Sequence, residues 1–345
     1  MNAAHDAIPF ATLEQAAEWY AVLRSGKVAD EERRRWAAWL AADDANRQAW
    51  ARVESIGQGV SFAKDAPEAA SSALVAANQL RQRRKMLKTL TLAAITGGLG
   101  WQLSRQDELR ATIAGLMATH RTGVGESNRL RLADGTQLWL NTHTAVDDRY
   151  DAKQRQLVLH HGEILIETHT DAQQPSRPFV VHSRQGSMRA LGTRFEVRQF
   201  DDHTRLGVSE GRVEVMPLGA SSPHIIEAGQ EVRFSRHAIS PADRLPPARQ
   251  AWTHGMLIAQ DLPLAQFLAE LSRYRHGHLG CDPAVADLRV VGGFPLRDTD
   301  QALAMLEAAL PVRAHAVMPW WVTVKPWQNY RTFRFPFSRV ARKAE

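Results

Sequence analysis

The chain has 345 residues, of which 44% are hydrophobic and 23% charged, a composition that excludes an intrinsically disordered protein. Its single cysteine, Cys281, excludes an intramolecular disulfide and supplies too few thiolates for a zinc or iron–sulfur site. The net charge of +6 does not indicate a nucleic-acid groove, because residues 1–80 hold 8 Lys and Arg against 11 Asp and Glu, and a short basic block follows them. We therefore expect two or three globular domains and no direct contact with nucleic acid.

Residues 1–57 predict a small all-α domain of three helices. Apolar residues recur at helical spacing around Trp19 in the first helix, Trp36 and Trp39 in the second, and Trp50 in the third. Four tryptophans carry more aromatic surface than so small a bundle can cover, and partly exposed tryptophans often anchor interfaces. We expect at least one of the four to contact a partner; the alternative is that all four belong to the core.

The most apolar stretch of the chain, residues 86–103, follows an Ala- and Ser-rich linker with a basic end at 58–85. The basic block consists of Arg81, Arg83, Arg84 and Lys85. Basic residues on one flank keep that flank of a membrane helix in the cytoplasm, and the stretch approaches the ~20 residues that cross a bilayer. The sequence predicts one transmembrane helix with a cytoplasmic N-terminus and an external C-terminus. A buried core helix and a twin-arginine export signal are the alternatives.

Residues 120–240 predict a β-rich domain. Polar and apolar residues alternate in short runs, and Asp134-Gly135 separates two such runs as a tight hairpin turn would. Many short antiparallel strands of this kind indicate a β-sandwich or a β-roll.

Residues 251–326 predict an α+β domain in which a strand–helix–strand unit occurs twice. The first helix spans Pro263 to Tyr274 and places Leu264 and Phe267 on one apolar face. The remaining residues, 327–345, form a basic, aromatic tail for which we have no assignment.

Enzyme and metal motifs in the chain lack the context that they require. The G-x-S-x-G string around Ser209 leads into a strand rather than from a strand into a helix. The paired histidines at 160–161 and 276–278 have no accompanying ligand spacing. We find no phosphate-binding or dinucleotide-binding string, so we expect no cofactor, no metal and no turnover site.

Several strings together resemble the FecR-like family of transmembrane anti-sigma factors. LADGTQLWLN, LHHGEILIE, PFVV, RALGTRFEV, VSEGRVEV and EAGQ occur in the order and spacing of the FecR-like domain over residues 120–235. EWYAVLRSG and WAAWLAADDANRQAW resemble the family's cytoplasmic anti-sigma domain, and DLPLAQFLAELSRY resembles the short signalling domain of secretins and TonB-dependent receptors.

The resemblance implies an inner-membrane regulator of iron or siderophore uptake genes. Its helical domain would bind an extracytoplasmic-function sigma factor through the four tryptophans. Its external end would meet the signalling domain of a ligand-loaded TonB-dependent receptor, with Leu264, Phe267 and Tyr274 as contacts, and periplasmic and intramembrane proteases would be further partners. The alternative is a periplasmic envelope scaffold or carbohydrate-binding membrane protein without a sigma partner.

The resemblance also singles out one peptide bond, Gly192-Thr193 in ALGTRFEV. Some FecR-like proteins are cut at the matching Gly-Thr, where the threonine hydroxyl can attack the preceding carbonyl in an N-to-O acyl shift. The simpler alternative is that Gly192 only opens a strand at a turn.

Overall fold

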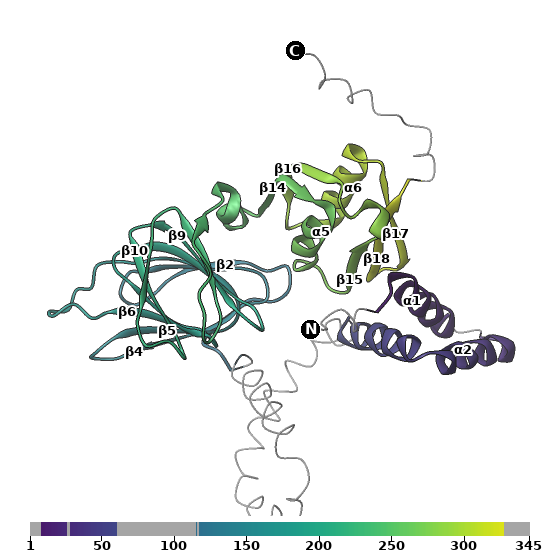
Figure 1. The fold of residues 1–345 in the computed structure, drawn as a ribbon, viewed down its shortest axis with the longest axis horizontal. Helices are drawn as coiled ribbons and strands as arrows, with labels where there is room; N and C mark the ends of the chain where they lie inside the picture. The colour runs from purple at the N-terminus through teal and green to yellow at the C-terminus, as the bar shows by residue number, and fades with distance from the viewer. Residues whose placement is uncertain (1–7, 26–27, 61–114, 116, 328–345) are drawn as a thin grey trace, which may run out of the picture. The chain divides into compact units, whose positions relative to one another are not determined.

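The computed structural model describes residues 8–25, 28–60, 115 and 117–327 (Figure 1). It divides into two compact units, one with Met1–Pro67, Ala259–Phe294 and Asp298–Glu345, the other with Glu68–Ile258 and Pro295–Arg297. The expected transmembrane segment at 86–103, its basic flank and the tail beyond 327 lie outside the described residues. Within the described residues, no helix has both the length and the apolar character needed to cross a membrane.

The N-terminal part is helical, as the periodicity predicts. Helix α1 spans Phe10–Arg24, α2 spans Asp30–Ala42 and a third helix covers residues 44–60. The Glu32 carboxylate accepts the Ala29 N–H at 2.9 Å and so satisfies one of the unpaired amides at the start of α2. Small residues in the bundle core let the helices approach closely. The buried members of that core are Ala16, Ala17, Tyr20, Ala49 and Val53.

The β-domain is a two-layered structure joined by one long strand, β5, and its strands pair antiparallel except for the parallel pair β5–β6. Its strands are β1 (His120–Arg121), β2 (Asn128–Arg131), β3 (Gln137–Leu140), β4 (Ala145–Tyr150), β5 (Arg155–Glu167), β6 (Phe179–His182), β7 (Gly186–Ala190), β8 (Arg194–Gln199), β9 (Thr204–Glu210), β10 (Arg212–Pro217), β11 (His224–Glu227), β12 (Gln230–Phe234) and β13 (Asp243–Arg244). The first half of β5 pairs with β4 and β6, the second half with β3 and β8. Gly162 allows the bend between the halves with a φ of 94°.

Both layers contribute apolar side chains to one core, because alternate residues of each strand face inward. Phe195 and Val197 of β8 and Leu138 and Leu140 of β3 are fully buried in it. The predicted hairpin between β2 and β3 is present, and Gly135 has a φ of 92° in its turn.

Residues 247–254 form a 3-10 helix, η1 (Pro247–His254), whose last four residues fall within the predicted α+β domain at 251–326. Its Trp252 is buried and donates its indole N–H to Glu196 of β8. Arg249 of the same segment binds Glu231 of β12 through two contacts of 2.9 and 3.0 Å. The segment therefore covers part of the outer face of the β-domain.

The C-terminal part is an α+β region with the expected doubled strand–helix–strand order. Its elements are β14 (Met256–Pro263), α5 (Leu264–Ser272), β15 (His278–Cys281), η2 (Pro283–Val285), β16 (Arg289–Pro295), α6 (Thr299–Ala309), β17 (Val312–Met318) and β18 (Trp321–Pro326). Strand β14 pairs with β16, and β18 lies between β15 and β17. Strand β17 was not predicted, because the alternation V-R-A-H-A in its sequence VRAHAVM is short and relies on alanines, which are weak strand formers.

Candidate functional site

The Gly192-Thr193 peptide bond lies where the chain passes from β7 to β8. Strand β7 pairs with β6 and β10, whereas β8 pairs with β5 and β9, so the bond connects the two layers. Gly192 is exposed and has a φ of 78°, a conformation that residues with a Cβ rarely adopt. Glycine adopts this conformation without strain, so Gly192 lets the chain turn from one layer to the other.

Thr193 is buried, and its backbone is held from both sides by one residue. Its N–H donates to the Thr168 hydroxyl oxygen at 2.8 Å, and its carbonyl accepts from the Thr168 N–H at 3.0 Å and from the Thr168 hydroxyl at 3.1 Å. The Thr193 hydroxyl is also buried, but it has no hydrogen-bond partner among the residues that the structure describes. A buried hydroxyl without a partner is uncommon and calls for a functional explanation.

A second glycine packs directly on this bond. A Cβ added at Gly211 would overlap the Gly192 carbonyl oxygen and come within 2.9 Å of Thr193 Cγ2. Gly211 has a φ of 73°, so a larger residue there would also be strained. Because Gly211 has no side chain, the Gly192 carbonyl can pack against the β9–β10 turn.

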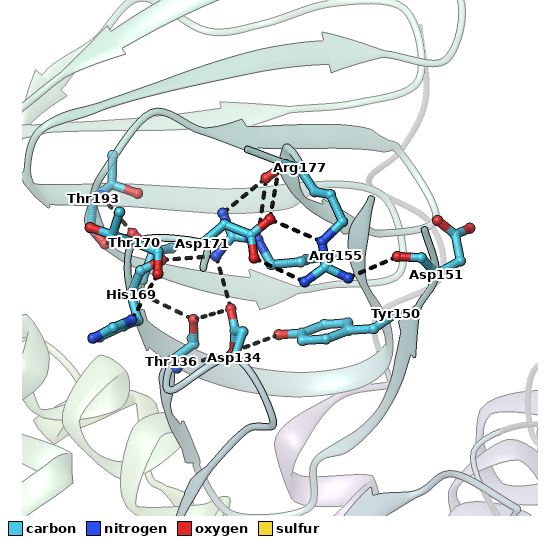
Figure 2. A network of polar contacts seen from close by, with 11 residues as sticks. Asp134, Thr136, Tyr150, Asp151, Arg155, His169, Thr170, Asp171, Arg177 and Thr193 are labelled. Atoms are coloured by element: carbon cyan, nitrogen blue, oxygen red, sulfur yellow. Dashed lines mark hydrogen bonds and ion pairs between the residues drawn. The ribbon is translucent and has the colours of Figure 1, made fainter. Parts of the chain in front are cut away.

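The segment that carries Thr168 is fixed by a network of buried polar groups (Figure 2). Arg155 of β5 forms an ion pair with Asp134 at 2.9 Å and donates to the His169 carbonyl at 2.8 Å. The His169 N–H donates to the Thr136 hydroxyl at 3.1 Å, and that hydroxyl donates to Asp134 at 2.8 Å. These contacts tie residues 168 and 169 to the β2–β3 turn.

A second ion pair completes the network. Arg177 contacts Asp171 through its guanidinium at 2.9 Å and through its backbone N–H at 2.8 Å, and donates to the Asp151 carbonyl at 2.8 Å. The Arg155 guanidinium in turn donates to the Arg177 carbonyl at 3.0 Å. Residues 168–178 are thereby held as an ordered loop beside the bond.

The Tyr150 hydroxyl joins the network by donating to Asp134 at 3.2 Å, and the network shifts the pKa values of Tyr150 and Asp171. Hydrogen bonds from Arg177 hold the pKa of Asp171 well below its usual range. Burial, followed by the neighbouring Asp134 charge, raises the pKa of Tyr150 far above its ordinary value. Asp171 is therefore ionised and Tyr150 neutral near pH 7, as their hydrogen bonds require.

A pocket of about 320 Å³ opens beside this network and reaches Gly192. Its lining includes Arg155, Thr168, Asp171, Arg177, Arg189 and Gly192. Solvent in this pocket would reach the Gly192-Thr193 bond, since Gly192 itself is exposed.

A different polar cluster lies under η1 on the outer face of the β-domain. Arg205 is within 3.0 Å of Glu163, 3.5 Å of Glu196 and 3.8 Å of Glu231. Asn141 donates to Glu163 at 2.7 Å and Trp252 donates to Glu196 at 3.1 Å. Burial and then the neighbouring Glu163 charge raise the pKa of Glu196 well above its usual range.

The four tryptophans of the helical domain are all half-buried. The Trp39 indole donates to Gln15 at 2.7 Å, whereas the buried indole N–H groups of Trp19 and Trp36 have no partner in the described parts of the chain. Trp36 packs against Trp50 with ring centroids 5.1 Å apart. Each tryptophan therefore combines packing in the bundle with some accessible surface.

The three expected receptor contacts are not equivalent. Leu264 and Phe267 are fully buried in the C-terminal region, where Phe267 packs on Phe294 with centroids 4.6 Å apart. Tyr274 is half-buried. In this structure only Tyr274 offers side-chain surface to a partner, and the other two hold α5 in place.

The residues considered for enzyme or metal chemistry have structural contacts. Ser209 lies in β9, between strands, and its hydroxyl accepts a hydrogen bond from Gln250. The His278 ring stacks on Trp321 with centroids 4.0 Å apart. Over the described ranges, no group of three or more His, Cys, Asp or Glu residues could hold a metal ion.

Sequence reasoning identified Gly192 and Thr193 but missed Thr168, Gly211 and the polar network. Thr168 follows β5 and is separated from Thr193 by 25 residues of chain. The Gly in the middle of the VSEGRVEV string was the visible signal, and its packing on Gly192 could be found only from the fold.

Comparison with known proteins gives the class of this chain. Residues 118–214 match the family described as FecR protein, and residues 14–56 match a domain of unknown function called DUF4880. The chain therefore contains a FecR-type domain and, nearer its N-terminal end, a DUF4880-type domain.

Two solved structures are similar to this chain, both of a candidate anti-sigma factor from Parabacteroides distasonis. Each is 21% identical, with a TM-score of 0.49. They cover 59% and 60% of this chain and 97% of their own chains. A comparison with curated proteins finds no match.

Proposed function

We propose that this chain is a transmembrane anti-sigma regulator that relays the state of an outer-membrane receptor to a cytoplasmic sigma factor. The observation that carries the proposal is the presence, in one chain, of a FecR β-domain and a DUF4880 helical domain with four half-buried tryptophans. Binding and signal transfer are therefore the functions that their surfaces support best.

The tryptophans support a sigma-binding role for the helical domain. Half-buried tryptophans are frequent anchors at interfaces. The unpartnered indole N–H groups of Trp19 and Trp36 would gain acceptors from a bound partner after a small local rearrangement. The family resemblance supplies the partner class, an extracytoplasmic-function sigma factor.

Co-purification of the full chain with each sigma factor of the same cell tests this role. Trp36→Ala is expected to weaken capture of one sigma factor by at least about tenfold, because interface anchors contribute about 2 kcal/mol or more. Trp139→Ala is the matched control, since Trp139 is a half-buried tryptophan of the β-domain with Arg129 over its ring at 4.6 Å. Failure of the wild-type chain to capture any sigma factor would overturn the proposal.

We further propose that residues 86–103 cross the inner membrane, with Arg81, Arg83, Arg84 and Lys85 on the cytoplasmic side. The β-domain and the C-terminal region then lie in the periplasm, where residues 251–326 receive the signalling domain of a TonB-dependent receptor. Tyr274 is the proposed side-chain contact, and Leu264 and Phe267 support α5 from the core. The iron or siderophore inducer class is supported by the family resemblance alone.

The first compact unit provides a direct test of this topology. In that unit Glu14 of α1 forms an ion pair with Lys325 of β18, and Tyr20 lies edge-on to Trp320 with centroids 5.4 Å apart. If residues 86–103 cross the membrane, α1 and β18 lie on opposite sides of it. The Glu14–Lys325 and Tyr20–Trp320 contacts cannot then form within one chain. The crossing therefore requires both contact surfaces to be free in the membrane-bound chain.

Cysteines placed by Glu14→Cys and Lys325→Cys in a Cys281→Ser chain distinguish the two arrangements. A membrane-impermeant maleimide added to cells with a permeabilised outer membrane is expected to label position 325 and not position 14. A disulfide between the two positions would contradict the crossing and support the compact unit instead.

We also propose that the Gly192-Thr193 bond undergoes self-cleavage. The unpartnered Thr193 hydroxyl, the exposure of Gly192 and the close packing of Gly211 on the bond support it. Intact-mass analysis of the purified chain should find two fragments that meet at this bond, and Thr193→Ala should remain whole. A wild-type chain that stays whole on long incubation would contradict self-cleavage.

A further inference from the structure

Thr168 is the residue that holds Thr193, and its contacts go beyond those that strand pairing requires. One hydroxyl both accepts the Thr193 N–H at 2.8 Å and donates to the Thr193 carbonyl at 3.1 Å. The Thr168 N–H adds a third contact, at 3.0 Å, to the same carbonyl. These contacts fix the backbone on both sides of the Thr193 Cα, whereas the Thr193 hydroxyl has no hydrogen-bond partner among the described residues.

Thr168 is itself firmly placed. The next residue, His169, is held through its N–H by Thr136 and through its carbonyl by Arg155. Arg155 is in turn neutralised by the buried Asp134 at 2.9 Å. Figure 2 shows Asp134, Thr136 and Arg155 in the network that reaches His169. The position of Thr168 is therefore set by the two-layered core and not by the loop alone.

The chemistry of an acyl shift indicates what this contact can do. The Thr193 Oγ1 forms a bond to the Gly192 carbonyl carbon and loses its proton, and the C–N bond to Thr193 then breaks while its nitrogen gains that proton. Water next cleaves the resulting ester and yields a Gly192 carboxylate and a free Thr193 amine. The group whose charge increases is the Thr193 nitrogen, which becomes an amine and then an ammonium.

We propose that Thr168 is a positioning residue for cleavage at Gly192-Thr193, a proposal that rests on the self-cleavage proposed above. Its hydroxyl oxygen accepts the N–H of the scissile nitrogen in the intact chain and stays in hydrogen-bonding reach as that nitrogen becomes positively charged. Hydrogen bonds from charged donors are about twice as strong as neutral ones. The contact therefore stabilises the reacting state more than the ground state, which is the condition for a rate increase.

The β-domain contains a matched control for this arrangement. The Thr122 hydroxyl accepts the Thr144 N–H at 3.0 Å, and the Thr122 N–H donates to the Thr144 carbonyl at 2.9 Å. The same hydroxyl also donates to the Asn141 carbonyl. Thr122 thus makes the same reciprocal contact at a strand junction, but no reactive bond is proposed beside it.

The test compares cleavage of the full chain in the variants Thr168→Val, Thr168→Ser and Thr122→Val. Thr168→Val is expected to slow cleavage by about 10- to 100-fold, because it removes one hydrogen bond to a charged donor. Thr168→Ser keeps the hydroxyl and should restore a rate near that of the wild type. Thr122→Val should cleave as the wild type does, although it loses a comparable structural contact.

The outcomes separate the two proposals. If the wild type is cut and Thr193→Ala is not, self-cleavage stands. A Thr168→Val chain that is then cut at the wild-type rate, with a wild-type circular dichroism spectrum, overturns the role of Thr168 alone. Equal slowing by Thr168→Val and Thr122→Val overturns it too, because general destabilisation would explain both. A whole wild-type chain refutes self-cleavage and, with it, this inference.

Discussion

The β-domain contains two buried polar sites that satisfy their hydrogen-bonding groups to different degrees. Under η1, Arg205, Glu163 and Glu196 form a cluster in which side chains contact one another at 3.0 to 3.5 Å, and Trp252 and Asn141 complete it. At the β7–β8 connection, Thr193 has every backbone group held and its hydroxyl left without a partner among the described residues.

The difference indicates distinct roles for the two sites. A connected polar network in a low-dielectric interior holds one arrangement, and removal of any member leaves other charges uncompensated. An unpartnered buried hydroxyl does not stabilise one arrangement, and its burial costs free energy on folding. It can, however, react without first breaking a hydrogen bond. The first site is suited to keep η1 in place, and the second to chemistry.

The largest expected effect comes from breaking the cluster. Arg205→Leu would leave three buried carboxyl groups without their shared cation, so we expect a loss of about 3 to 5 kcal/mol in the free energy of unfolding. Arg129→Leu is the control, since Arg129 is exposed and its contact with Trp139 contributes about 0.5 to 1 kcal/mol. Urea denaturation of the detergent-solubilised chain measures both, and similar losses in the two variants would contradict the view of the cluster as a network.

A smaller effect is expected when pH changes the same cluster. The pKa of Glu196 is raised in the folded chain, so the folded state binds more protons than the unfolded state between the two pKa values. The stability contributed by protonated Glu196 is complete below its unfolded pKa and is lost as pH rises through the folded pKa.

Between about pH 6 and about pH 9 we therefore expect a loss of about 1 to 3 kcal/mol, together with faster hydrogen exchange in residues 247–254. Glu163, Glu231, Arg205 and Arg249 are the other charged groups at this site, and Arg205 opposes the shift. Glu196→Gln keeps an oxygen for the Trp252 indole and cannot ionise, so its profile over this range should be flat. A wild-type profile that is already flat would refute the raised pKa.

The sequence predicted local structure well and the two polar sites poorly, for physical reasons. Helical spacing located α1 and α5, and Asp134-Gly135 located the β2–β3 hairpin, because these signals lie within a few residues of one another. In β8 a strict alternation that places Phe195 inside would place Glu196 at the surface. Glu196 is 2% exposed because Trp252, 56 residues away, covers it.

The same limit applies at the proposed cleavage site. Gly192 and Thr193 were found through a family resemblance, whereas Thr168 is an ordinary residue at the end of a strand. Its role depends on the register that places β5 beside β8, with Glu167 opposite Arg194. The buried positions of Leu264 and Phe267 follow from the same helical spacing that suggested them, because the apolar face of α5 packs on its own sheet.

The smallest expected effect is a gain in the free energy of unfolding, caused by Thr193→Val. It tests most directly whether the two polar sites differ. Thr193→Val replaces the unpartnered hydroxyl by a methyl group of similar shape, so it removes a desolvated polar atom and breaks no hydrogen bond. We expect the β-domain to gain about 1 to 2 kcal/mol in the free energy of unfolding. The variant should also stay uncut. Urea denaturation and hydrogen exchange of the β8 amides compare the variant with uncut wild-type protein.

Thr144→Val is the matched control for this sign. Thr144 is fully buried, and its hydroxyl accepts from the Glu163 N–H at 3.0 Å and contacts the carbonyls of Thr142 and Glu163 at 3.2 Å. The Thr144→Val substitution leaves the buried hydrogen-bond partners of this hydroxyl unsatisfied. It should lower the free energy of unfolding by about 1 to 3 kcal/mol. If Thr193→Val destabilises the chain as much as Thr144→Val does, the Thr193 hydroxyl has a partner in solution. It would then have to break a hydrogen bond before attacking Gly192, and the two sites would no longer differ in kind.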